Sequence, residues 1–322
     1  MKKAFSRALR VFLAFMDILW VLGALAVCIA WWIGWWYRDE TPLTTWLYFI
    51  PPLGVILFGY LWLFLTLKRR FRLVQLFVFA TIAMCFVKVL LIDHRWHPPP
   101  ETLPDDNLRL LHWNTAWGVL GVESIVRSIA HDGPDIVVIS EPPRLDMISD
   151  IAYHALGMAH VFTDSGITVA SHYPIAYGGA LDIDTMVAWH VRIDTDRGPL
   201  ELCAVDMVSR PNFNRRPSLK KLADWVAART NGLPLLMVGD FNTPHDSLAF
   251  GPLREHLGHA YEQGGRLWPY SWPVPVPVFA IDHIWANDRV RINDYFLKTT
   301  KYSDHKRQIA DFSLLPAKPT DP

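Results

Sequence analysis

The chain has 322 residues, of which 51% are hydrophobic, and its 31 basic residues balance its 31 acidic ones. The neutral total conceals two opposite parts: residues 1–104 carry 11 Lys and Arg against 5 Asp and Glu (net +6), and residues 105–322 carry 20 against 26 (net −6). The acidic second part argues against a protein that grips long nucleic acid through many phosphate contacts. The second part holds a single cysteine, Cys203, which excludes a disulfide framework there, and Cys28 and Cys85 lie in apolar runs.

Three apolar runs occupy the first part of the chain, at Val11–Tyr37, Leu43–Leu67 and Leu73–Ile92. Each run reaches the roughly 20 residues that a helix needs to cross a bilayer. The Pro51-Pro52 pair predicts a kink in the second helix. Residues 1–95 are therefore predicted to form a membrane domain with three transmembrane helices. The alternative is a buried helical hairpin of a large soluble protein, which would need more covering surface than the rest of the chain offers.

The basic residues of this part predict its orientation. They precede the first apolar run and separate the second from the third, at Lys2, Lys3, Arg7, Arg10, Lys68, Arg69, Arg70 and Arg72. Because loops rich in Lys and Arg stay in the cytoplasm, the N-terminus is predicted to be cytoplasmic. Three crossings then place the rest of the chain outside the cytoplasm, held at the cell membrane by a short proline-rich spacer over residues 96–104.

Residues 105–322 interleave apolar runs typical of strands with amphipathic helical segments. This order predicts an α/β (α+β) fold of two mixed sheets packed face to face, with helices outside. Helices are predicted over Val122–Ala130, Arg144–Leu156 and Pro217–Thr230. Strands are predicted over Leu108–Trp113, Asp135–Ser140, Ile167–Ala170, Met186–Ile193, Leu200–Val205, Leu235–Val238, Ile281–Ala286 and Gln308–Phe312.

Polar residues stand at the ends of five of these strands. The clearest case is Leu235–Val238, which runs through Gly239 into a carboxylate and an amide. Carboxylate and amide oxygens that meet at one sheet edge can hold a divalent cation against a phosphate. The residues at the five strand ends are Asn114, Glu141, Asp240, Asn242, Asp282, Asp304 and His305.

The ordered motifs that carry these residues resemble the endonuclease/exonuclease/phosphatase family, which has the deoxyribonuclease I-like fold. They are His112-Trp113-Asn114, Ile139-Ser140-Glu141, Gly239-Asp240-Phe241-Asn242, Ile281-Asp282-His283 and Ser303-Asp304-His305. The resemblance implies a four-layer α/β/β/α sandwich over residues 105–322. It also implies a hydrolase of phosphoric esters that uses Mg²⁺, or Mn²⁺ in its place.

The resemblance assigns a role to each motif residue. Glu141, with Asn114 and Asp304, is the expected metal-binding set. Asp240 is expected to orient or deprotonate the attacking water, and Asn242 to hold the phosphate or Asp240. The remaining pair, Asp282 and His305, is expected to place a protonated imidazole beside the phosphate.

The chain departs from the family pattern at two positions. Ala116 stands where a second acidic residue often follows the asparagine, so metal binding is expected to depend more on Glu141 and Asp304. Asp206 stands where many members have a phosphate-contacting histidine. Arg210, Asn212 and Arg216 follow closely and are candidate substrate-binding residues together with Asp206. We expect Asp206 to pair with Arg210 or Arg216 and to leave the phosphate to Asn212; the alternative is that Asp206 binds a cation. The alternative for these basic residues is a solvated loop before the next helix.

Two functions follow from the sequence. The first is a membrane-anchored, extracytoplasmic, Mg²⁺-dependent phosphoesterase acting on a lipid headgroup, a nucleotide or nucleic acid, with long nucleic acid disfavoured by the acidic charge. The second is a catalytically inactive, membrane-anchored binding module of the same fold. Ala116 and Asp206 favour the second, whereas the intact motifs favour the first. The sequence predicts no protein partner.

Overall fold

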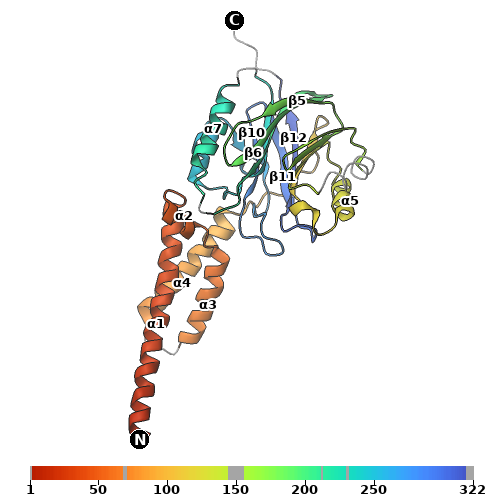
Figure 1. Cartoon of the computed structure of the whole chain (residues 1–322). Helices are drawn as coiled ribbons and strands as arrows, with labels where there is room; N and C mark the ends of the chain where they lie inside the picture. Colours follow the sequence, from red (N-terminus) through yellow and green to blue (C-terminus); the bar gives the residue numbers. More distant parts are fainter. Residues whose placement is uncertain (1, 68–70, 144–155, 212, 230–231, 317–322) are drawn as a thin grey trace. The chain divides into compact units, whose positions relative to one another are not determined.

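A computed structural model describes every residue except 1, 68–70, 144–155, 212, 230–231 and 317–322 (Figure 1). The chain forms two compact units, Met1–Asp93 and His94–Pro322. The helix predicted over Arg144–Leu156 lies, apart from its last residue, outside the described residues, as does the candidate residue Asn212.

Helices follow the apolar runs in the first unit. They are α1 (Lys2–Tyr37), α2 (Pro42–Tyr48), α3 (Pro52–Thr66) and α4 (Arg72–Val87), followed by the π-helical turn η1 (Lys88–Ile92). Two stretches in the described part of the chain are long and apolar enough to cross a membrane, Val11–Tyr37 and Arg72–Ile92. A third span arises only if α2 and α3 are counted together.

The kink predicted at Pro51-Pro52 is confirmed, and it divides the run Leu43–Leu67 into two helices, because the chain bends by 66° between α2 and α3. Two consecutive prolines explain this break. Neither Pro51 nor Pro52 has an N–H, and each ring clashes with a preceding helical turn. Pro52 instead begins α3, the position where proline is best tolerated.

Side chains from α1, α3 and α4 form the core of the first unit. Trp62 is fully buried, and its indole N–H donates to the backbone oxygen of Trp20 at 3.0 Å. Cys28 and Cys85 are buried in the same core. These two and Cys203 are free thiols, and all three are buried.

The described part of the second unit contains two six-stranded sheets. The first has the order β11-β12-β1-β2-β4-β3, formed by β1 (Leu108–Asn114), β2 (Ile136–Ser140), β3 (His160–Asp164), β4 (Ile167–Ser171), β11 (Val290–Lys298) and β12 (Arg307–Leu314). The second has the order β5-β6-β7-β8-β10-β9, formed by β5 (Ile175–Ala180), β6 (Met186–Thr195), β7 (Gly198–Met207), β8 (Leu235–Asp240), β9 (Gly258–His259) and β10 (Asp282–Ala286). The helical segments are η2 (Ala116–Gly118), α5 (Val122–Asp132), α7 (Arg216–Ala227), η3 (Leu248–Phe250), α8 (Gly251–Arg254) and α9 (Ala260–Gly264).

The layers of this unit follow from which faces are apolar. Residues from the inner faces of both sheets, such as Val138 and Leu202, form one buried core between them. The outer face of the first sheet packs on Ile125 and Ile129 of α5. The outer face of the second sheet packs on α7, which lies across the sandwich from α5 in Figure 1. The predicted α/β/β/α sandwich is confirmed.

Strand direction brings the polar strand ends to one edge. β1 and β2 pair in parallel, as do β7 and β8, so each pair ends on the same side of its sheet. β10 runs antiparallel to β8 and therefore begins where β8 ends. The pairing directions of these strands therefore place the polar strand ends at the same edge of the sandwich.

Candidate active site

Three aspartates from adjacent strands of the second sheet lie in register. Asp240 at the end of β8 faces Asp206 on β7 and Asp282 on β10. Side chains at paired positions of neighbouring strands project from the same face, so the three carboxyl groups are close together. Such a group of acids is unfavourable unless protons or cations offset the charge.

The first offsetting cation is His305. Its Nδ1 lies 2.8 Å from Oδ2 of Asp282, and both side chains are buried. Burial alone would lower the pKa of His305, but Asp282, Asp240 and Asp304 outweigh it and raise that pKa to about 10. Burial would likewise raise the pKa of Asp282, but the charge and hydrogen bond of His305 hold it below its usual value. The pair is therefore an imidazolium beside a carboxylate at neutral pH.

Asp240 is held by two donors. The backbone N–H of Asn242 donates to Oδ1 at 2.9 Å, and the side-chain amide of Asn114 donates to Oδ2 at 3.0 Å. Nε2 of His305 lies 3.9 Å from the same Oδ2. Burial and the charge of Asp282 raise the pKa of Asp240 to about 7, against the opposing effect of His305 and of both donors. A carboxylate with that pKa can exchange a proton near neutral pH.

Asn114 connects Asp240 to Glu141. Its amide nitrogen also lies 3.3 Å from Oε1 of Glu141, while its carbonyl oxygen accepts the N–H of Ala116 at 2.9 Å. Glu141 has a left-handed backbone, with φ of 48°. Strained backbone of this kind is costly and tends to occur at functional positions. The hydroxyl of Thr115 donates to the Glu141 backbone oxygen at 2.7 Å and holds this turn in place.

Asp304 lies at the exposed rim of the site, next to His305. Its Oδ2 accepts the indole N–H of Trp272 at 2.8 Å. The hydroxyl of Ser303 joins this turn to β1, because it donates to the backbone oxygen of Asn114 at 2.7 Å. Sequence reasoning gave Ser303 and Trp272 no role, since a hydroxyl beside a motif and a tryptophan in a proline-rich stretch carry no distinctive signal.

The expected arginine partner of Asp206 is not found among the ion pairs of the described residues. Arg210 is exposed, and buried Arg215 directs its guanidinium to the backbone oxygens of Val208 and Arg210, each at 2.9 Å. Burial, followed by the charges of Asp240, Glu141 and Asp282, raises the pKa of Asp206 to about 8. Asp206 therefore interacts electrostatically with the other acidic side chains of the site, not with an arginine.

Asn242 holds the turn after β8 against the end of β7. Its side-chain amide donates to the backbone oxygen of Met207 at 2.8 Å, and its φ of 47° is left-handed. His283, the residue after Asp282, points to the opposite face of β10 from Asp282, as strand alternation requires. There it bonds to the backbone oxygen of Thr243 at 2.7 Å and to His259 at 2.9 Å.

The sequence profile of the Endonuclease/Exonuclease/phosphatase family matches residues 111–305. The chain belongs to this family. The matched range begins on β1 and ends at His305, so it contains every strand end described above. No curated protein matched the sequence.

Solved structures share the fold at low sequence identity. The endonuclease/exonuclease/phosphatase from Beutenbergia cavernae DSM 12333 is 17% identical over 67% of this chain and 73% of its own, with a TM-score of 0.53. The endonuclease/exonuclease/phosphatase from Bacteroides vulgatus is 16% identical over 65% of this chain and 99% of its own, with a TM-score of 0.52. A humanized D. rerio TDP2 with 14 mutations is 13% identical over 65% and 100%, also with a TM-score of 0.52.

The donors at this edge fit the divalent metal ion that family members generally use. Besides burial, Asp240, Glu141 and Asp282 raise the pKa of Asp206, and Asp282 raises the pKa of Asp240, while His305 opposes both shifts. Asp240, Asp282 and His305 have potential ligand atoms within 4.8 Å of one another. Because a protonated imidazole has no free lone pair, His305 cannot be a ligand there while Asp282 holds its proton. The carboxylate oxygens remain, and these suit Mg²⁺.

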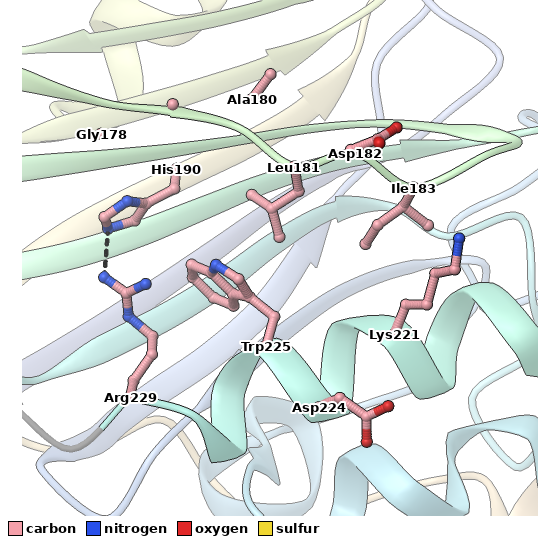
Figure 2. A pocket seen from close by; sticks show the side chains of 11 residues that line it. Gly178, Ala180, Leu181, Asp182, Ile183, His190, Lys221, Asp224, Trp225 and Arg229 are labelled. Carbon is pink, nitrogen blue, oxygen red and sulfur yellow. Dashed lines mark hydrogen bonds between the residues drawn. The ribbon is translucent and has the colours of Figure 1, made fainter.

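A separate hollow of about 440 Å³ lies between strands β5 and β6 and helix α7 (Figure 2). In its wall, Nε2 of His190 accepts from Arg229 at 3.1 Å, and the same guanidinium covers the Trp225 ring at 4.3 Å. Its lining is Gly178, Gly179, Ala180, Leu181, Asp182, Ile183, His190, Lys221, Asp224, Trp225 and Arg229. It includes none of the candidate site residues, so the hollow and the polar strand ends are distinct.

Proposed function

We propose that this chain is a membrane-anchored, extracytoplasmic, Mg²⁺-dependent hydrolase of phosphoesters. The observation that carries the proposal is the buried Asp240, whose pKa of about 7 and contacts with Asn114 and His305 suit a group that takes a proton from water. The substrate is a lipid headgroup, a nucleotide or nucleic acid. The net charge of −6 over residues 105–322 favours small or membrane-borne phosphates.

Each residue of the site has a part in this proposal. Glu141, Asn114 and Asp304 would hold the cation, with Asp206 close to Glu141, and the amide nitrogen of Asn114 joins Glu141 to Asp240. When bound, Mg²⁺ polarises the phosphoryl group. Asp240 orients the attacking water and accepts its proton, while His305, kept protonated by Asp282, stabilises the charge that develops on the phosphoryl oxygens. Asn242 holds the turn that carries these groups, and Arg210 and Arg216 lie on the loop beyond β7.

A substrate panel tests the proposal directly. The full chain in detergent should hydrolyse a short-chain phospholipid, a nucleotide or a simple aryl phosphodiester with Mg²⁺ present, and plasmid DNA more slowly. Chelation of the metal should abolish turnover. A full chain that is folded yet inert on every phosphoester would overturn the proposal in favour of the inactive binding module.

The Mg²⁺ requirement should depend on the carboxylates. Glu141→Gln removes a charged ligand, so the Mg²⁺ concentration for half-maximal activity should rise at least about tenfold, a typical cost of disturbing a metal site. Asp206→Asn should raise the requirement less, because Asp206, with a pKa of about 8, is mostly protonated at neutral pH and carries its charge only when a cation lies beside it. Mg²⁺ titrations of activity measure both. Glu262→Gln, an exposed acid paired with Arg254, is the matched control and should leave the requirement unchanged.

The orientation of the chain can be measured with reporter fusions. An alkaline phosphatase fusion at Asp105 should be active, because that reporter works only outside the cytoplasm, whereas a green fluorescent protein fusion at the same residue should be dark. A fusion after Leu67 should behave in the opposite way. A fluorescent fusion at Asp105 would show that the catalytic unit is cytoplasmic and that the chain crosses the membrane an even number of times.

A further inference from the structure

An uncharged aromatic loop, Leu267–Phe279, borders the candidate site. It has neither acidic nor basic residues, and four of its thirteen residues are proline. Proline fixes φ and has no N–H, so the loop is stiff and has fewer backbone donors to satisfy. Val276, near its tip, is 56% exposed.

The outer end of the aromatic loop is joined to the start of the second unit. Leu267 and Arg95 form an antiparallel bridge in which each backbone N–H donates to the other's oxygen at 2.8 Å. The rings of Trp96 and Trp268 lie 4.1 and 4.3 Å from the ring of His94. Trp96 is 70% exposed, Leu267 49% and Trp268 36%. Trp96, Leu267 and Trp268 form one exposed surface, here called the aromatic patch.

The position of this patch in the sequence indicates what covers it. Trp96 follows the end of the candidate span at Ile92 by four residues, a length that reaches at most about 14 Å when fully extended. Trp96 is therefore tethered within reach of the surface of any bilayer that the span crosses. Tryptophan is enriched at the headgroup level of membranes, and exposed apolar patches mark surfaces that bind membranes or partners.

The inner end of the aromatic loop contacts the candidate site. Besides the bond from Trp272 to the carboxylate of Asp304, the N–H of Val274 donates to the backbone oxygen of Asp304 at 2.7 Å. The ring of Trp272 lies 6.4 Å from that of His305. One stiff segment therefore joins the aromatic patch to two candidate site residues.

We propose that the aromatic loop and Trp96 insert into the headgroup layer of the bilayer that anchors the chain, and that the site takes its phosphoester from a lipid of that layer. Irregular backbone is not tolerated in lipid-exposed hydrocarbon, which limits the depth to the headgroups. The lipid substrate rests on the proposed function, whereas the insertion does not.

Depth-dependent quenching tests the insertion without any turnover. Val276→Cys is labelled with an environment-sensitive fluorophore in the full chain, reconstituted in vesicles of phosphatidylcholine and phosphatidylglycerol. The native cysteines are buried, so labelling is selective. Headgroup spin-labelled lipid should quench the Val276 probe but not a matched probe at Tyr177, which is 60% exposed on the opposite edge strand β5. Equal, weak quenching at both positions would overturn the insertion.

Activity on two substrate forms tests the lipid source. Val276→Asp and Trp96→Ala each remove apolar contact with the bilayer, so hydrolysis of a vesicle phospholipid should fall about tenfold, while a water-soluble short-chain phosphoester is cleaved as before. Equal loss on both substrates, or no loss on either, would overturn the lipid source. If wild type cleaves no phosphoester, the proposed function and the lipid source fail together, and the quenching result still decides the insertion.

Discussion

Asp240→Asn should abolish hydrolysis of every phosphoester that the wild-type chain cleaves, by about 10²–10⁴-fold at any Mg²⁺ concentration. Asparagine has nearly the same shape but cannot accept a proton from water. The loss should appear in kcat, because the group acts on the reacting water rather than in ground-state binding. Steady-state kinetics with saturating Mg²⁺ separates the two variants, because additional Mg²⁺ should restore the activity of Glu141→Gln but not that of Asp240→Asn.

The Asp240→Asn chain should remain folded. Burial and Asp282 already raise the pKa of Asp240 to about 7, so the ionised form is costly at neutral pH and its removal destabilises little. Asp311→Asn is the matched structural control. Asp311 is equally buried, but it lies on β12 of the first sheet, where its Oδ1 accepts from Nε of Arg109 at 2.8 Å. That substitution should lower the stability to urea and leave the rate per folded molecule intact. Normal activity in Asp240→Asn would remove the central assignment, and an unfolded chain would make Asp240 structural.

The sequence was sufficient to predict the strands that carry the site, because each is a short apolar run that ends in a turn. The run Leu235–Val238 corresponds to β8 and the run Gln308–Phe312 to β12. Pairing in parallel or antiparallel fashion then leaves little freedom in where the polar ends meet. The fold and its family could therefore be inferred before any coordinates.

Several strands were missed for physical reasons. β11 is nine residues long, but its pattern is broken where its register with β12 shifts between Ile292 and Asp294, and the bulge puts polar residues in the run. β3 and β5 are edge strands of their sheets, where one side faces solvent and the apolar pattern is weak. β9 has only two residues.

The surroundings of Asp206 were beyond reach of sequence reasoning for another reason. The nearby Arg210 and Arg216 favoured an ion pair, yet Arg210 is exposed and no ion pair joins either arginine to Asp206 among the described residues. Burial raises the pKa of Asp206 most, and the carboxylates that raise it further come from β8, β10 and the end of β2, tens of residues away. Contacts across strands of this kind depend on register, which a single sequence does not report.

Asp282→Asn should move the alkaline limb of the pH–rate profile to lower pH. In the wild type, Asp282 is the strongest of the groups that raise the pKa of His305 to about 10, so His305 stays protonated and active through pH 8 to 9. Without that carboxylate, burial lowers the pKa and only Asp240 and Asp304 oppose it. At pH 9 the variant should therefore lose most of its activity, and lowering the pH should restore a part of it.

The contribution of His305 to the free energy of unfolding should also fall as the pH rises. His305 has a folded-state pKa above its unfolded value of about 6.5, so its contribution is complete below that value and is lost as the pH rises towards 10. The contribution changes by about 1.4 kcal/mol per pH unit in that window. Urea unfolding of wild type and Asp282→Asn between pH 6.5 and 10 should therefore show a declining difference in the free energy of unfolding.

His305→Gln separates the two parts of this prediction. The variant has no titratable imidazole, so its activity should be low at every pH. The activity of Asp282→Asn should instead recover as the solution is made more acidic. An Asp282→Asn profile that keeps the wild-type alkaline limb would show that His305 need not be charged for turnover. The imidazole would then be a neutral donor to the phosphate, and the Asp282–His305 pair would serve only to orient it.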